Sequence, residues 1–132
     1  MAPTTPFGLK TADNPDGTDR QVYDKLIAAL QANRQAFLAG GAPNFLGRNA
    51  EPELADWAMS IALQAAPQAQ VQCIRAFAET DFRPDMRAVT QPTLIVYGSG
   101  DAPVAAVNAR RTQTAIAGAA WKSMSARPMP CP

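Results

Sequence analysis

Histidine is absent from all 132 residues of the chain. It is the usual general base for a serine or cysteine nucleophile, so its absence removes the commonest partner for either residue. The sequence also lacks a Gly-x-Ser-x-Gly segment, the sharp turn that presents a nucleophilic serine. Together these two absences exclude a self-contained hydrolase triad within this sequence.

The sequence also has a small net charge, no long apolar run and only two cysteines. The net charge is +1, with dispersed basic residues, which gives no electrostatic footprint for nucleic acid or an anionic membrane. No apolar run approaches the roughly 20 residues needed to span a bilayer. Residues 1–5 show no secretory signal pattern, and two cysteines, Cys73 and Cys131, do not suggest a disulfide framework. We therefore expect a single-domain, cytoplasmic protein with no nucleic-acid or membrane partner.

The strongest structural signal is an apolar run followed by a glycine-rich turn. Pro92 opens Thr-Leu-Ile-Val-Tyr, and Gly98-Ser99-Gly100 closes it before Asp101. A run without alternation is typical of a fully buried parallel strand. Function in open α/β sheets lies at the carboxyl ends of the strands, which makes Asp101 a candidate functional residue.

Most of the remaining sequence has helical periodicity. Thr18 and Gln21 have the spacing of a capping box, and a helix is predicted over 19–38, with a break near Asn33 and an end at Gly40-Gly41. A loop is predicted over 43–49. Further helices are predicted to begin at Pro52 and Pro67, with a short piece near Met86 and a last helix over 104–117 that stops at Gly118.

Only a short extended run over 121–124 follows that last helix, before a proline-rich tail. A lone parallel-type strand leaves donors and acceptors unpaired on both edges. The sequence therefore predicts a part of a larger fold, with self-association through the uncovered strand.

Three segments resemble the cofactor-free haloperoxidase and esterase group of α/β-hydrolases. Residues 9–17, Leu-Lys-Thr-Ala-Asp-Asn-Pro-Asp-Gly, are similar to the segment that enters the helical lid of that family. Residues 76–85, Ala-Phe-Ala-Glu-Thr-Asp-Phe-Arg-Pro-Asp, are similar to the exit from the lid, and residues 92–101 to the strand that presents the acid of the triad. The resemblance covers roughly residues 6 to 118 and only the carboxyl-terminal half of such an enzyme.

The resemblance implies an incomplete α/β-hydrolase fold that is mostly helical as it stands. Its parts would be an entry loop (1–17), a helical lid region (18–91), a strand-helix-strand remnant of the α/β core (92–125) and an irregular tail (126–132). The nucleophile elbow and most of the sheet would be missing. No cofactor or metal is implied, and the substrate would be a small organic ester or acid if another chain complements this one.

The resemblance also assigns roles to three residues. Asp101 would be the acid that orients the catalytic histidine, although a turn aspartate often serves only its local backbone. Phe45 and Trp57 lie in the lid, whose inner face would bind substrate. For Phe45, a place in the core is an equal alternative. The alternative for Trp57 is a place in the core, since it shares a helical stripe with Leu54 and Ile61, and this alternative is favoured.

The resemblance and the amphipathic helices lead to two alternative hypotheses for the function. The first is a partial serine-dependent esterase, or haloperoxidase acting through a peracid, that is inactive alone. The second is a small helical binding module without catalysis, because amphipathic helices leave apolar faces that need a partner.

The tail supports the first function through its codons. The family's last strand ends in Ala-Pro-His, whereas the corresponding register here is Ala126-Arg127-Pro128-Met129. With GCG for Ala126, CGC for Arg127 and CCC for Pro128, a reading frame shifted back by one base encodes Ala-Pro-His. The histidine codon itself depends only on a Pro128 codon that ends in C. We therefore predict a frameshift in the coding sequence between about Ala117 and Trp121.

Overall fold

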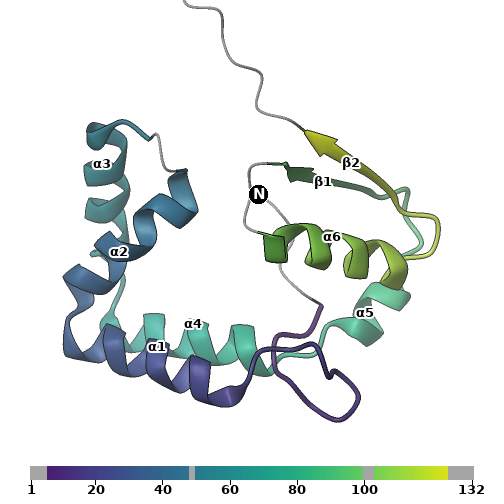
Figure 1. The fold of residues 1–132 in the computed structure, drawn as a ribbon, viewed down its shortest axis with the longest axis horizontal. Helices are drawn as coiled ribbons and strands as arrows, with labels where there is room; N and C mark the ends of the chain where they lie inside the picture. The colour runs from purple at the N-terminus through teal and green to yellow at the C-terminus, as the bar shows by residue number, and fades with distance from the viewer. Residues whose placement is uncertain (1–5, 48–49, 100–102, 125–132) are drawn as a thin grey trace, which may run out of the picture. The chain divides into compact units, whose positions relative to one another are not determined.

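The computed structural model describes residues 6–47, 50–99 and 103–124 (Figure 1). It forms two compact units, one of Leu9–Thr80 and one of Met1–Gly8 with Asp81–Pro132. The first unit contains α1 (Arg20–Ala32), α2 (Arg34–Leu46), α3 (Pro52–Ala62) and α4 (Pro67–Glu79). The second contains α5 (Arg83–Arg87), β1 (Leu94–Gly98), α6 (Pro103–Ala115) and β2 (Ala120–Met124).

The helical unit is held together by α1 and α4, which pack side by side (Figure 1). Tyr23 and Leu30 on α1 are buried, as are Val71 and Ala78 on α4. The ring of Tyr23 meets that of Phe77 edge to face, with 6.4 Å between centroids. These helices therefore carry the core of the unit, as their apolar spacing predicts.

The predicted break near Asn33 is confirmed, but the predicted end at the glycine pair is wrong. The Asn33 side chain accepts a hydrogen bond from the amide of Ala36 at 3.0 Å and so caps α2. The helix continues through Gly40 and Gly41 to Leu46 and ends at Gly47, which has a φ of 95°. Glycine is a weak helix former but still adopts helical angles, so most of the loop predicted over 43–49 is helix.

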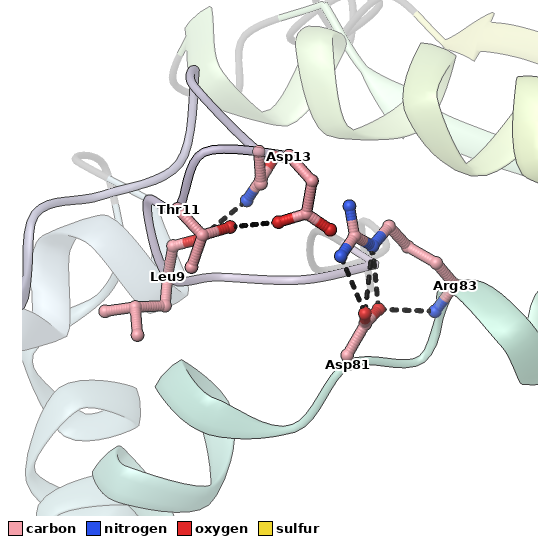
Figure 2. Close-up of polar contacts among 6 residues, drawn as sticks. Leu9, Thr11, Asp13, Asp81 and Arg83 are labelled. Carbon is pink, nitrogen blue, oxygen red and sulfur yellow. Dashed lines mark hydrogen bonds and ion pairs between the residues drawn. The ribbon is translucent and has the colours of Figure 1, made fainter.

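The start of α1 also differs from the prediction. Asp19, not Thr18, occupies the N-cap, and its side chain makes no capping hydrogen bond. Thr18 instead pairs with the entry loop, where its carbonyl oxygen accepts from the amide of Lys10 at 2.9 Å. Figure 2 shows two further bonds in this loop: the Leu9 carbonyl accepts from the side chain of Asn14 at 2.8 Å, and the Thr11 hydroxyl donates to Asp13 at 2.6 Å. These contacts fix the path of the chain into α1.

Helix α3 begins at Pro52 as predicted, yet it buries no residue. Its apolar stripe is exposed, with Leu54 at 42%, Trp57 at 62% and Ile61 at 47% of full exposure. The core position favoured for Trp57 is therefore wrong in this unit. An apolar stripe predicts a buried face only where another element is present to cover it.

The second unit is a two-stranded sheet covered on one face by α6 (Figure 1). β1 and β2 are parallel, with Leu94 opposite Ala120 and Gly98 opposite Met124. The predicted extended run over 121–124 is therefore a true partner of β1. The core of the unit is formed by four buried side chains, Ile95, Ala109, Ile116 and Ala119.

The helix-to-strand connection in this unit also follows the prediction. The last helix stops at Ala115, and Gly118 in the following turn has a φ of 74°, which glycine adopts without strain. The amide of Ala120 then donates to the carbonyl oxygen of Thr93 at 3.0 Å and begins the pairing of the strands. The glycine thus allows the reversal that brings β2 beside β1.

Two side chains of β1 are exposed among the described residues of this unit, which corrects the prediction of a fully buried strand. Leu94 is 61% exposed and Val96 is 36% exposed. The amide of Ala120 donates to the Thr93 carbonyl and that of Ser99 to the Met124 carbonyl, so odd-numbered residues of β1 bond to β2. The main-chain groups of Leu94 and Val96 therefore point to the other edge of β1.

Within the described ranges, none of the helices is both long and apolar enough to cross a membrane.

Candidate functional site

The three residues singled out from the sequence have different outcomes. Asp101 lies outside the described residues, and its proposed role as the triad acid stays a prediction. β1 ends at Gly98, so Asp101 follows closely on the carboxyl end of a parallel strand. Phe45 lines a cavity in the helical unit, whereas Trp57 is exposed on α3 and is not among the lining residues.

That cavity lies between α2 and α3 and has a volume of about 320 Å³. Ligand pockets in proteins usually begin near this size. All of its lining side chains are uncharged, and most are apolar: Phe37, Leu38, Gly41, Ala42, Phe45 and Leu46 from α2, and Ala58, Met59 and Ala62 from α3. The site therefore has the size and polarity for an apolar organic group.

The α2 side of the cavity exists because this helix continues past the glycine pair to Leu46. Phe37, Gly41 and Phe45 are spaced by four residues, so they lie along one face of the helix. This spacing was visible in the sequence. It was missed because the glycine pair was interpreted as the end of the helix, which separated Phe45 from Phe37.

Arg34 fixes the far end of α3 near this cavity. Its Nη2 atom donates to the carbonyl oxygens of Leu63 at 3.0 Å and Ala62 at 3.2 Å, and also to that of Ala65. Its Nε atom donates to the side-chain oxygen of Gln70 at 2.7 Å. The last carbonyls of a helix have no partner within it, and Arg34 supplies one. No sequence motif singled out this residue.

A second cavity in the helical unit is much smaller, at about 40 Å³. It is partly polar and includes Arg20, Asp24 and Glu79 in its lining. A space of this size holds about one water molecule, so it is not a substrate site. Among the described residues, no group of three histidine, cysteine, aspartate or glutamate side chains is placed to hold a metal ion.

An ion pair orders the chain where the second unit resumes after α4. Asp81 accepts from Nε of Arg83 at 2.9 Å and from Nη2 at 2.7 Å (Figure 2). The hydrogen bond from the Arg83 side chain holds the pKa of Asp81 below its usual value of 3.8. The guanidinium also lies over the ring of Phe7, 4.9 Å from its centroid.

Comparison with known proteins identifies the family of this chain. The chain is 33% identical over 130 residues to a non-heme chloroperoxidase from Streptomyces lividans, a match that covers 93% of this chain and 47% of that protein. A crystal structure of bromoperoxidase from Bacillus anthracis matches 91% of this chain and 46% of its own, at 28% identity, with a TM-score of 0.81. The chain belongs to the α/β-hydrolase family.

Within this family, the matches are to the non-heme haloperoxidases and esterases. A bifunctional esterase/perhydrolase from Acinetobacter calcoaceticus is 32% identical over 103 residues, which are 73% of this chain and 37% of that protein. No family model matches the sequence. The chain spans about half the length or less of the relatives it matches. The incomplete α/β-hydrolase fold predicted from three short segments is therefore confirmed.

Proposed function

We propose that this chain is the lid and acid-bearing part of a serine-dependent ester hydrolase, and that it is inactive by itself. The observation that carries the proposal is the match to non-heme haloperoxidases and an esterase/perhydrolase over less than half of their length. The 132 residues include no histidine, so the chain cannot complete a serine triad from its own residues.

Asp101 is the one triad member that we assign to this chain. A triad aspartate accepts a hydrogen bond from the histidine, which fixes the tautomer of the ring and stabilises the imidazolium that forms during acyl transfer. The position of Asp101 after the carboxyl end of β1 supports this role, because catalytic groups of open α/β sheets gather at that edge. The serine and histidine must come from elsewhere.

The resemblance implies a choice of acceptor in the second half of the reaction. Serine attack on an ester releases the alcohol and leaves an acyl-enzyme. Water then gives the carboxylic acid, whereas hydrogen peroxide gives the peracid, which can oxidise a halide ion. The bifunctional esterase/perhydrolase from Acinetobacter calcoaceticus combines these two activities. Neither route needs a metal or haem.

Phe45 is the proposed substrate contact in the lid. It lines the apolar cavity beside α3, although 74% of its surface is exposed. Trp57 remains a proposed substrate contact on the exposed face of α3, where a large aromatic surface is free within the helical unit. In this proposal residues 18–91, which include α1–α4, form the lid, and residues 92–125 belong to the catalytic core.

An ester assay tests the proposed inactivity. The purified chain and its Asp101→Asn variant are each incubated with p-nitrophenyl butyrate, and release of p-nitrophenolate is followed against buffer. We expect both to match the buffer rate. Turnover by the wild-type chain that disappears in the variant would overturn the proposal, because it would show a working site that depends on Asp101.

The alternative is a small helical binding module. The buried contacts between α1 and α4 favour it, since they give the helical unit a core of its own. The many exposed apolar side chains of α3 and β1 favour the hydrolase part instead. Cooperative thermal unfolding of a monomer would support the module, whereas a broad transition with aggregation would support the hydrolase part.

A further inference from the structure

The cavity between α2 and α3 has properties that define its ligand. We propose that it binds one uncharged apolar group of about two fused rings, or an acyl chain of about ten carbon atoms. The size follows from the volume of about 320 Å³, since an apolar cavity of about 150 Å³ holds one benzene molecule. This inference rests on the proposed function in one respect only: the group would be part of the ester substrate.

The lining explains why the space stays open. Gly41 and Ala42 on α2 lie among the lining residues together with Ala58 and Ala62 on α3. Side chains this small cannot fill the space between two helices. Phe37 and Phe45 supply aromatic surface along the α2 side. The cavity therefore combines small side chains, which leave its space open, with aromatic surface that can contact an apolar group.

The chemistry of the lining selects against charge. Each of the nine lining residues has an uncharged side chain. Moving an ionised group from water into such surroundings is costly unless an opposite charge or hydrogen-bond donors receive it. Met59 adds a polarisable sulfur atom, which makes favourable contacts with aromatic rings. The neutral form of a ligand should therefore bind much better than a matched anion.

The contacts of Arg34 hold the two helices at this spacing. Its guanidinium joins the start of α2 to the last carbonyls of α3 and to Gln70 at the start of α4. Gln70 also donates to the Ala62 carbonyl at 2.8 Å. These hydrogen bonds, including charge-assisted ones, join the start of α2 to the carboxyl end of α3. The cavity is therefore supported by polar contacts at its end.

Two neighbouring glycines of α2 provide a matched pair of variants. A Cβ atom added at Gly40 or at Gly41 meets no atom within 4 Å, so both positions accept a side chain. Only Gly41 lines the cavity. Leucine is a better helix former than glycine, so both Gly40→Leu and Gly41→Leu should preserve α2. The two variants add the same apolar surface, and only Gly41→Leu places it in the cavity.

The test is a fluorescence titration of the whole chain with N-phenyl-1-naphthylamine, an uncharged probe. Its comparator is 1-anilinonaphthalene-8-sulfonate, which has the same ring system with an anionic group. We expect the wild-type chain and Gly40→Leu to bind the neutral probe with equal Kd, and Gly41→Leu to bind it at least tenfold more weakly. The anionic probe should bind the wild-type chain at least tenfold more weakly than the neutral one.

Equal binding of the neutral probe by the two glycine variants would overturn the proposal, since the probe would then bind elsewhere. Equal affinity for the neutral and anionic probes would overturn the assigned ligand class. If Gly41→Leu loses its helical circular dichroism, Ala62→Leu replaces it, with Ala36→Leu on the exposed part of α2 as its control. These outcomes do not depend on catalysis, so they are separate from the ester assay.

Discussion

Arg34 and Gln70 converge on a single backbone oxygen, the carbonyl of Ala62 at the end of α3, at 3.2 Å and 2.8 Å. The two side chains also bond to each other at 2.7 Å. This relationship connects the start of α2, the end of α3 and the start of α4. It also supplies partners for carbonyls that a helix end leaves unpaired.

Removal of this contact should destabilise the helical unit. Arg34→Ala leaves the carbonyls of Ala62 and Leu63 without their charged donor, and we expect the free energy of unfolding to fall by about 2 kcal/mol. Arg20→Ala is the control, because Arg20 pairs with Glu79 at the exposed surface and should change stability little. Urea unfolding followed by circular dichroism measures both. Equal effects of the two substitutions would contradict the role of Arg34.

The exposed strand predicts self-association. Val96 lies on the exposed face of β1, and the main-chain groups of Leu94 and Val96 point to the outer edge of the strand, where a second copy could pair with them. Residues 92–98 carry no charge that would oppose this pairing. We expect the sedimentation coefficient of the wild-type chain to rise with concentration.

Val96→Lys should abolish this rise, since an added charge on the strand opposes edge pairing. Val107→Lys is its control, because Val107 is exposed on α6 rather than on the sheet. A wild-type chain that stays monomeric at every concentration, or two lysine variants that behave alike, would be evidence against pairing through β1.

Acid should weaken the second unit through Asp81. The folded-state pKa of this carboxyl is lower than its unfolded value, so its contribution to stability is complete above about pH 3.8 and is lost as the pH falls through the folded pKa. Asp81→Asn should therefore flatten the dependence of the unfolding midpoint on pH below about pH 4. Asp56→Asn removes an exposed carboxylate of α3 as a control. An unchanged pH profile in Asp81→Asn would refute this contribution.

The reading-frame hypothesis is decided by the coding nucleotides. It requires the Pro128 codon to end in C, because that base starts the histidine codon in the shifted frame. β2 begins at Ala120 and pairs with β1 in register through Met124, so the segment after the proposed shift still forms a strand. A Pro128 codon that ends in any other base would eliminate the hypothesis.

The sequence was informative where a signal was local. Asn33 as a helix boundary, Pro52 and Pro67 as helix starts, and Gly118 as a stop follow from backbone chemistry within a few residues. The incomplete α/β-hydrolase fold followed from resemblance. In contrast, the burial of Trp57 and of β1 depends on which elements cover them, which a pattern of apolar residues does not specify.

The candidate site was only partly predictable for a related reason. Phe45 was selected for its place in the lid, and the cavity beside it also needs Gly41 and Ala62, small residues whose importance lies in the space they leave. Such residues have no chemical signal in a sequence. Arg34 was missed because its partners are backbone carbonyls of another helix, which no side-chain motif records.

The central claim is that this chain is a compatible part of an α/β-hydrolase in which Asp101 is the acid. A test of this claim must supply the catalytic serine and histidine, which this chain lacks. The chain with Met129→His is co-expressed with the part of the Streptomyces lividans chloroperoxidase that the match leaves out, and hydrolysis of p-nitrophenyl butyrate by the purified complex is measured.

We predict clear esterase activity from this complex and a loss of about 10⁴-fold when Asp101→Asn is added, as for a triad aspartate. The same activity with and without Asp101→Asn, or a stable complex that stays inactive with Met129→His, would contradict the account.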